Sequence, residues 1–413
     1  MRPRPHCSGR PTALRVLSSP ARCRCVLGRL QSLDETPPLR ILHVASGDLW
    51  AGAEVQVFTL MSHLARMPET AVAAVLLNEG ALAAKLRAVG IEVFIADERQ
   101  SGAVGLLMRL HGVLRGWRPD LVHTHRVKEN ILGAIANRLG GNVPCVRTVH
   151  GSHERRPVRG ARGAINRAVF GLDRWCGRVL QQKIIAVSEP LAVELAQEYP
   201  PGRIAILENG VDVDRVLFER AAAGFRAATP DAQHIGIVGR LVSVKRVDLF
   251  LQAASLLRTE SIGSALRFHV FGDGPLRPDL ENLARQLHLA DVVRFHGHRH
   301  DIASCIGQLD LLVICSDHEG LPMVALEALV LRVPTVAHAV GGLVDVVPEE
   351  FLVRRHDPQA YKSQILHALG KQGRMIAEAN SLEKLPRFTA ERNAQRAREV
   401  YAELIATREG TRR

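Results

Sequence analysis

The sequence is poor in three features that would assign it to particular classes of protein. Aromatic residues make up 4% of the chain, with three Trp and three Tyr, so it lacks the stacking surface typical of single-stranded nucleic-acid binders. No stretch of about 18 uncharged apolar residues occurs, which argues against a membrane-spanning helix. The seven cysteines form no paired C-x-x-C motifs, and this favours a reducing cytoplasm over a disulfide-built secreted protein.

The sequence does contain enough apolar material for a sizeable core. Hydrophobic residues make up 46% of the chain and charged residues 23%, as in folded globular proteins. At about 150 residues per domain, 413 residues indicate two or three domains. Lys and Arg outnumber Asp and Glu by 54 to 42, and the formal charge of +12 favours anionic partners such as nucleotides, phosphorylated sugars or an acidic lipid surface.

Residues 1–37 differ from the rest of the chain. They are rich in Arg, Pro, Cys and Ser and show no sustained hydrophobic periodicity, so we predict a basic, disordered tail. A secretory signal is a poor match, because no apolar core of about 7–15 residues follows the early arginines.

From residue 38 onward, short apolar runs alternate with helical stretches, and this alternation predicts parallel sheets covered on both faces. The rhythm is interrupted near 212–232 and then restarts. We predict an α/β protein with two doubly wound, Rossmann-like domains, 38–212 and 213–388, that face each other across a cleft, followed by a helix over 389–407. The predicted strands are 41–46, 71–77, 91–96, 120–125, 144–150, 183–188 and 203–210 in the first domain, and 234–240, 267–274, 292–297, 309–316 and 333–339 in the second.

Ligands of open parallel sheets bind beyond the carboxyl ends of the strands, and the segment 315–342 has the strongest chemistry there. A strand ends near Cys315, and Pro322 is well placed to open a helix. The free backbone N–H groups of a helix start suit a diphosphate. Glu319 and Glu327 would accept hydrogen bonds from sugar or ribose hydroxyls. The alternative, two solvated carboxylates at a helix start, is less favoured because of the surrounding loop.

Two further strand ends carry candidate ligand-binding groups. Arg240 follows a predicted strand and Lys245 lies five residues on, and fixed cations of this kind stabilise a departing diphosphate. Gly47 and Gly52 lie between a strand and a helix, where backbone can approach a phosphate or sugar. This loop is not G-x-G-x-x-G, so a nicotinamide dinucleotide site is weakly supported.

These segments resemble the retaining GT-B glycosyltransferases marked by E-x7-E, the nucleotide-sugar-dependent group 1 or family 4 type. The resemblance covers about residues 39–405, and EGLPMVALEA and VGRLVSVKRVD are its most specific parts. It implies that the first domain takes the acceptor and the second the nucleotide sugar. It also implies that the last helix crosses back to the first domain.

The resemblance implies roles for individual residues. Glu319 would contact hydroxyls of the donor sugar, and Glu327 would hold the ribose. His150 resembles the family histidine near the reacting carbon, so the catalytic residues would be His150 and Glu319. The other implied positions are the diphosphate site (Arg240, Lys245, Gly320, Leu321 and Pro322), the glycine loop (Gly47 and Gly52) and the nucleotide-base region (Gly272, Gly274 and His298).

The activity implied by the resemblance is transfer with retention and without metal or other cofactor. A hexose-type sugar would move from a nucleotide sugar to a hydroxyl of a glycan or lipid-linked saccharide, for example lipopolysaccharide or another cell-envelope glycan. Two alternatives stay open: a nucleotide-sugar epimerase of the same fold, and a non-catalytic protein that binds nucleotide sugars or anionic lipids. We expect a cytoplasmic location, with peripheral contact with the inner face of the cell membrane as an open addition.

One position departs from the family pattern. The family's glycine loop is usually Gly-Gly-Ala-Glu, whereas this chain has Ala51-Gly52-Ala53-Glu54. A positive φ at Ala51 would strain the loop; an ordinary φ would change little.

Several patterns resemble ligand sites but have simpler interpretations. The D-x-D pattern of Asp212 and Asp214 is interpreted as a structural turn, and the run of His296, His298 and His300 is not expected to bind metal. His123 and His125 are interpreted as structural rather than acceptor-binding. The Arg-rich stretch 153–178 is either a solvated helix face or a contact with an anionic membrane or phosphorylated acceptor.

Overall fold

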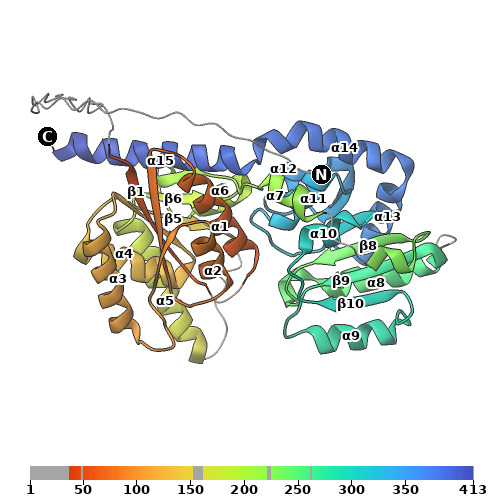
Figure 1. Ribbon diagram of the computed structural model, residues 1–413. Helices are drawn as coiled ribbons and strands as arrows, with labels where there is room; N and C mark the ends of the chain where they lie inside the picture. The colour runs from red at the N-terminus through yellow and green to blue at the C-terminus, as the bar shows by residue number, and fades with distance from the viewer. Residues whose placement is uncertain (1–36, 48–49, 152–160, 221–224, 261–262, 413) are drawn as a thin grey trace, which may run out of the picture. The chain divides into compact units, whose positions relative to one another are not determined.

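The computed structural model describes residues 37–47, 50–151, 161–220, 225–260 and 263–412 (Figure 1). Residues from Pro38 onward form one compact unit. The predicted tail therefore lies outside the described residues, apart from Pro37, as do Asp48 and Leu49 of the glycine loop and residues 153–160 of the Arg-rich stretch.

The first sheet has seven parallel strands in the order β3-β2-β1-β4-β5-β6-β7. Side chains alternate between its two faces: Ile41 packs with the helices α1 and α2, whereas Leu42 packs with α3 and α4. The strands are β1 (Leu39–Ala45), β2 (Thr70–Leu76), β3 (Glu92–Ile95), β4 (Leu121–His125), β5 (Cys145–Val149), β6 (Lys183–Ala186) and β7 (Ile204–Ile206). The helices are α1 (Gly52–Ala65), α2 (Ala81–Ala88), α3 (Ala103–Trp117), α4 (Val127–Gly140), α5 (Ala161–Val179) and α6 (Glu189–Ala196).

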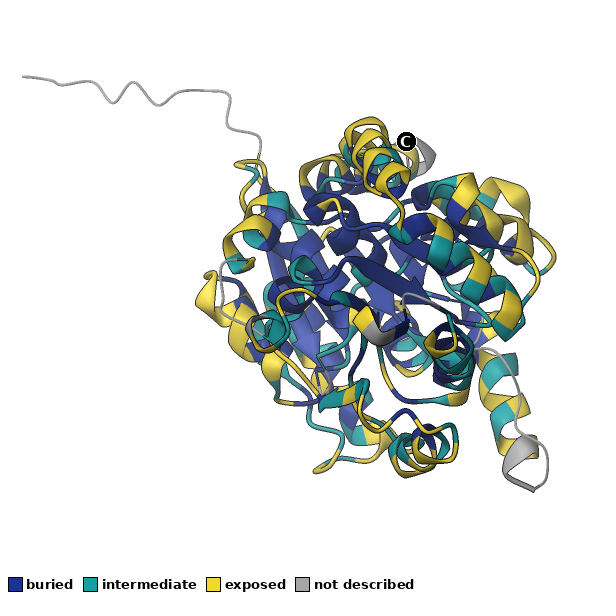
Figure 2. Ribbon diagram, turned by 90° about the vertical axis from the view of Figure 1, so that its right-hand side faces the viewer, coloured by how far each residue is buried: buried dark blue, intermediate teal, exposed yellow. Residues whose placement is uncertain are grey.

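The second sheet has six parallel strands in the order β10-β9-β8-β11-β12-β13. Its strands are β8 (Gln233–Val238), β9 (Leu266–Phe271), β10 (Val293–Gly297), β11 (Leu311–Ile314), β12 (Thr335–His338) and β13 (Leu352–Val353). Its helices are α7 (Val213–Glu219), α8 (Val247–Arg258), α9 (Arg277–Gln286), α10 (Ile302–Gly307), α11 (Met323–Leu331), α12 (Leu343–Val346), α13 (Pro358–Leu369) and α14 (Lys371–Lys384). Figure 2 shows buried strands surrounded by helices that expose their outer faces.

The predicted fold class is confirmed: both sheets are entirely parallel and both carry crossover helices. Strand β13 was not predicted from the sequence, because a two-residue strand is too short to show a hydrophobic pattern. The predicted strand 203–210 is shorter in the structure, where it ends at Ile206.

The last helix, α15 (Ala390–Arg412), leaves the second sheet and packs against α1 of the first (Figure 1). Backbone bonds hold its start, since Val211 N–H donates to Phe388 O at 2.8 Å and Ala390 N–H donates to Val211 O at 3.0 Å. Tyr401 lies fully buried in the same apolar cluster as Ile41. None of the described helices is both long and apolar enough to cross a membrane.

Candidate active site

The carboxyl ends of strands from both sheets open onto one cavity of about 320 Å³. The first sheet contributes Arg126 after β4 and His150 after β5, and the second contributes Arg240 after β8. Parallel strands end at the same sheet edge, and for this reason residues far apart in the sequence meet here.

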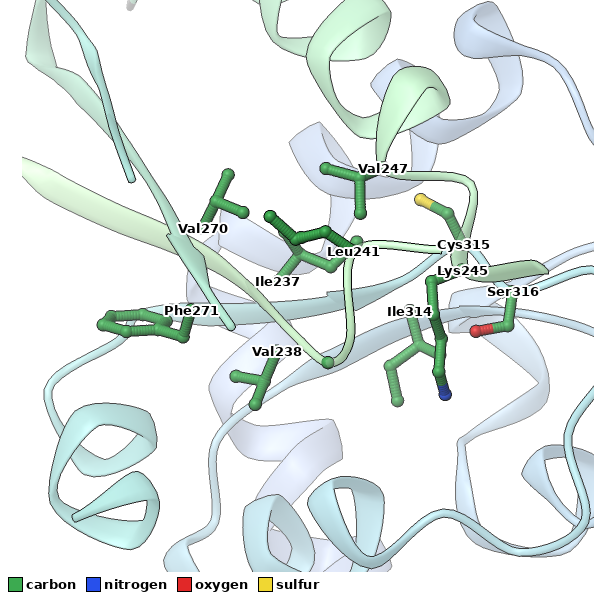
Figure 3. Close-up of a pocket in the computed structure, with 11 residues that line it drawn as sticks. Ile237, Val238, Leu241, Lys245, Val247, Val270, Phe271, Ile314, Cys315 and Ser316 are labelled. Carbon is green, nitrogen blue, oxygen red and sulfur yellow. The ribbon is translucent and has the colours of Figure 1, made fainter. Parts of the chain in front are cut away.

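Lys245 and Glu319 form an ion pair at this cavity. The Lys245 ammonium donates to Glu319 Oε1 at 2.6 Å, and Ser316 Oγ donates to the same oxygen at 2.6 Å. Figure 3 shows Lys245 and Ser316 beside the apolar ends of the strands, where a void of only about 10 Å³ remains. The side chains beneath the ion pair are therefore closely packed. A ligand phosphate near Lys245 would compete with Glu319 for the positive charge of the Lys245 ammonium.

Arg240 is exposed at the same cavity and forms no ion pair with any residue that the structure describes. It is a cation available to an anionic ligand. Gly320, Leu321 and Pro322 line the cavity just before α11, and Pro322 has the extended backbone of a helix N-cap, with φ of −74° and ψ of 132°. The first N–H groups of α11 thus lie at the cavity, as diphosphate binding requires.

Glu327 lies on α11 with its side chain only 8% exposed, and it lines the cavity. Burial raises the pKa of this carboxyl to about 7, although the charge of Arg215 acts in the opposite direction. The Arg215 guanidinium is 3.8 Å from Glu327 Oε1, too far for a hydrogen bond. The carboxylate therefore retains the capacity to accept hydrogen bonds from a ligand.

His150 contacts both halves of the site. Its Nε2 lies 3.2 Å from His125 Nδ1, and its own Nδ1 is buried without a hydrogen-bond partner in the described part of the chain. Burial, together with the nearby charge of Arg126, lowers the pKa of His150 to about 3, so the ring is neutral. A Cβ atom on Gly320 would lie 2.1 Å from His150 O. Only glycine permits this close approach to β5 of the loop that precedes α11 (residues 315–322, the α11 loop).

The glycine loop and the base region are only partly at the cavity. Gly52 lines it, and Ala51 has an ordinary φ of −134°, so the departure from the family pattern causes no backbone strain. Gly47 does not line the cavity; a Cβ atom there would lie 2.4 Å from Asn78 O.

Gly272 and His298 line the cavity, whereas Gly274 packs against the Leu241 backbone. Gly272 has a φ of +135°, and a Cβ atom there would lie 1.9 Å from Gly239 O. The structure therefore brings all the predicted site residues to the cavity except Gly47 and Gly274, which serve close backbone packing.

Two of the cations that line the cavity, Arg126 and Arg215, were not predicted from the sequence. Arg126 lies directly after β4 with a φ of +60°, strained for a non-glycine residue. Its Nη2 lies 2.5 Å from the buried Glu54 carboxylate. The position after a strand is the signal that could have identified Arg126. Arg215 had no such signal, because it reaches Glu327 only through the packing of α7 on α11.

The two aspartates of the D-x-D pattern have different positions at the start of α7. Asp212 Oδ1 accepts from Arg215 N–H at 3.0 Å and caps α7. Asp214 is exposed in the first turn of that helix. Both aspartates therefore lie at a helix start, where the sequence predicted a structural turn.

Comparisons with known proteins agree with this architecture. Residues 50–215 match the family model described as Glycosyltransferase Family 4, and residues 232–371 match Glycosyl transferases group 1. Over 307 residues the chain is 31% identical to D-inositol 3-phosphate glycosyltransferase 2 of Catenulispora acidiphila, with 69% of this chain and 71% of that protein covered.

A second relative is the Escherichia coli UDP-Gal:alpha-D-GlcNAc-diphosphoundecaprenol alpha-1,3-galactosyltransferase, 26% identical over 73% of this chain and 80% of that protein. Among solved structures, Anabaena Alr3699/HepE in complex with UDP-glucose is similar with a TM-score of 0.74 and 19% identity, covering 88% of this chain and all of the other. This last likeness concerns the fold.

The two parallel-sheet domains define the GT-B class of glycosyltransferase. Within that class, the chain belongs to the group 1, or family 4, glycosyltransferases. The protein is thus a transferase enzyme, and its cavity is the candidate active site.

Proposed function

We propose that the protein is a retaining, metal-independent glycosyltransferase that moves a hexose-type sugar from a nucleotide sugar to a hydroxyl of a glycan or lipid-linked saccharide. The observation that carries the proposal is one cavity that unites two cations, a helix start and two glutamates. Arg240, Lys245 and the start of α11 would bind the diphosphate. Glu327 would accept hydrogen bonds from the ribose hydroxyls.

The Lys245–Glu319 ion pair suggests how the donor would be engaged. A diphosphate would take over the Lys245 charge, and Glu319 would then be free to bind sugar hydroxyls. As the bond from the anomeric carbon to the phosphate oxygen breaks, the cations would stabilise the leaving diphosphate. The acceptor oxygen would bond to that carbon from the same face, and its proton would pass to the leaving phosphate oxygen. These roles need positioning and fixed charge, and no metal.

The surface of α5 supports a lipid-linked acceptor. Five large apolar side chains are exposed along this helix: Ile165, Val169, Leu172, Trp175 and Val179. Arg167, Arg174 and Arg178 are exposed beside them. An apolar stripe next to cations suits an anionic membrane surface, and one relative is named for a diphosphoundecaprenol acceptor. Peripheral attachment to the inner face of the cell membrane, as for a lipopolysaccharide-type acceptor, would follow.

The donor is tested first by thermal unfolding with UDP-, GDP- and ADP-sugars, since a ligand of the folded state raises the unfolding temperature. The sugar that stabilises the protein is then incubated with lipid-linked and soluble acceptors in excess chelator. We expect an α-linked product from an α-linked donor. A changed sugar formed without acceptor would indicate an epimerase, and binding without turnover would indicate a binding protein. Activity that is lost in chelator and restored by a divalent ion would contradict the metal-free mechanism.

Arg240→Gln tests the site directly, because this side chain has no protein partner among the described residues to lose. We expect roughly tenfold weaker binding of the nucleoside diphosphate, as for the loss of one charge-assisted hydrogen bond, with the unfolding temperature unchanged. Arg285→Gln, on the exposed face of α9 and away from the cavity, is the matched control. Equal binding by both variants would contradict the site.

A further inference from the structure

Four histidines of the first sheet lie in contact beneath the candidate active site. His43 on β1 pairs in register with His123 on β4, and His125 lies two residues further along β4. All three are buried, and their candidate ligand atoms lie within 4.8 Å of one another. His150 follows β5 and extends the group to the cavity.

Three of these histidines form a chain of hydrogen bonds. His43 Nδ1 lies 3.1 Å from His125 Nε2, and His125 Nδ1 lies 3.2 Å from His150 Nε2. The two nitrogens at the ends, His43 Nε2 and His150 Nδ1, are buried and have no hydrogen-bond partner among the residues that the structure describes. The chain of hydrogen bonds therefore runs from His43 in the sheet interior to His150 at the cavity.

The fourth histidine stands apart from this chain. His123 Nδ1 lies 2.7 Å from the Tyr401 hydroxyl, and His123 Nε2 lies 2.7 Å from Thr148 Oγ1. Because both of its nitrogens are engaged in short hydrogen bonds, it offers no free lone pair to a metal. The arrangement is thus a hydrogen-bonded cluster rather than a prepared metal site.

Each of the three histidines in the hydrogen-bonded chain is neutral. Burial lowers the pKa of His43 and of His150 to about 3 and holds the pKa of His125 well below its usual value. The charged neighbour is Arg126, which is paired with Glu54 and further disfavours imidazolium. A neutral imidazole carries one N–H and one lone pair, so all the N–H groups of the chain must point in the same direction.

The two possible directions differ at their ends. If the N–H groups point inward, His43 Nε2–H is an unpaired donor at a residue that is 0% exposed. If they point toward the cavity, His43 presents only a lone pair, and the unpaired donor is His150 Nδ1–H, an atom that is also buried but belongs to a partly exposed residue lining the cavity. Unpaired N–H groups deep in a protein are rarer than unpaired acceptors, so the second direction is favoured.

We propose that His43 and His125 are positioning residues that fix His150 as the Nδ1–H tautomer, so that His150 donates a hydrogen bond to an oxygen of the bound nucleotide sugar. The identity of that ligand rests on the proposed function, whereas the tautomer does not. A donor at this position would interact with a sugar hydroxyl or phosphate oxygen and would be held ready before the ligand arrives.

The tautomer is measured by long-range ¹H–¹⁵N spectra of the full chain labelled with ¹⁵N-histidine, with His150 assigned from the His150→Gln spectrum. We expect His150 to show the Nδ1–H pattern at pH 7 without ligand. An Nε2–H pattern would overturn the proposal. Displacement of the His43, His123 and His125 signals by one equivalent of Zn²⁺ would also overturn it, in favour of a metal site.

Variants at His125 separate positioning from structural support. His125→Phe removes the donor to His150 Nε2, and we expect the tautomer to change and kcat to fall about tenfold, with the donor KM changed less than about threefold. His125→Asn places an amide nitrogen near the former Nδ1 and should restore both. His123→Gln is the control: it should lower the unfolding temperature and leave the His150 tautomer unchanged.

An unchanged tautomer in His125→Phe would overturn the proposal. If His150 carries Nδ1–H but no nucleotide sugar binds or reacts, the proposed function fails while the tautomer assignment stands.

Discussion

At the scale of single residues, the buried Glu327 carboxyl would couple its own solvation to the ligand binding that we propose for it. Its pKa of about 7 reflects burial, and the Arg215 guanidinium at 3.8 Å compensates only in part. The ionised form accepts hydrogen bonds best, yet it is the form that burial disfavours. A ligand with two hydroxyls would supply the missing solvation.

The pH dependence of Glu327→Gln tests this interpretation. Because the pKa is higher in the folded than in the unfolded protein, the wild type loses stability as pH rises from about 4.5 to about 7. The variant lacks this loss, so its free energy of unfolding relative to wild type should be higher at pH 8 than at pH 5, by about 1–3 kcal/mol. Denaturant unfolding measures it.

The affinity for nucleotide should rise with pH, whereas the stability of the wild type falls with pH. Affinity of the wild type for the nucleoside diphosphate should fall as pH drops below about 7, whereas Glu327→Gln should bind weakly at every pH. Titration calorimetry at pH 6 and 8 measures this, with the exposed Glu350→Gln as control. A variant that retains the wild-type slope would show that another group titrates.

The candidate site was predicted from sequence where its residues follow strands or open a helix. Arg240, Lys245, His150 and Glu319 follow strands, Glu327 lies in the second turn of α11, the helix that the Glu319 loop opens, and all five line the cavity. The Lys245–Glu319 pair was not predicted, because strand position indicates which edge a residue reaches but not which side chain it meets there.

At the scale of elements, the α11 loop is set by glycines that no side chain could replace. A Cβ on Gly341, which has a φ of +53°, would lie 2.0 Å from Glu319 O, and one on Gly320 would meet His150 O. Gly342 N–H donates to Gly320 O at 2.6 Å. The loop is thus packed backbone against backbone between β5 and α12, which fixes Glu319 at the cavity.

Gly320→Ala should therefore disrupt the site. The added methyl group would collide with the His150 carbonyl, which is held by the surrounding backbone. We therefore expect a lower unfolding temperature, a free energy of unfolding lower by more than about 1 kcal/mol, and loss of most transferase activity. Gly112→Ala in α3, where a Cβ would meet nothing within 4 Å, should be neutral or slightly stabilising. Thermal unfolding and product formation measure both; a Gly320→Ala protein of wild-type stability would contradict this packing.

At the scale of the whole molecule, α15 connects the second sheet to the first through a polar cluster. Asn393 Oδ1 accepts from Gln56 Nε2 at 3.0 Å, and Asn393 Nδ2 donates to Glu208 O. Gln56 Oε1 in turn accepts from Gly210 N–H at 3.1 Å. This cluster orders the crossing between the sheets, where an apolar contact alone would not specify the register.

Asn393→Ala leaves a buried amide and a carbonyl unpaired, and we expect it to lower the free energy of unfolding by about 2 kcal/mol. Gln395→Ala, on the exposed face of the same helix, should change it by less than about 0.5 kcal/mol. Chemical denaturation compares the two. Equal stabilities would mean that the polar cluster does not hold α15 in place.

The fold class followed from the alternation of apolar runs and helical stretches, because each run is long enough to show its period. The partner of α15 did not follow from periodicity. Amphipathic spacing indicates that a face of α15 is buried, but its contact with α1 depends on residues such as Gln56 and Asn393, which lie 337 positions apart.

The ion pair between Lys245 and Glu319 has a consequence for the end of each catalytic cycle. Under the proposed function, the nucleoside diphosphate that remains after transfer would no longer carry a sugar to occupy Glu319, and the carboxylate would pair again with the Lys245 ammonium. This competition for the Lys245 charge would lower the affinity for the nucleoside diphosphate product relative to the intact donor. We therefore expect product inhibition to be milder in the wild type than in Glu319→Gln, in which no negative charge remains to promote departure.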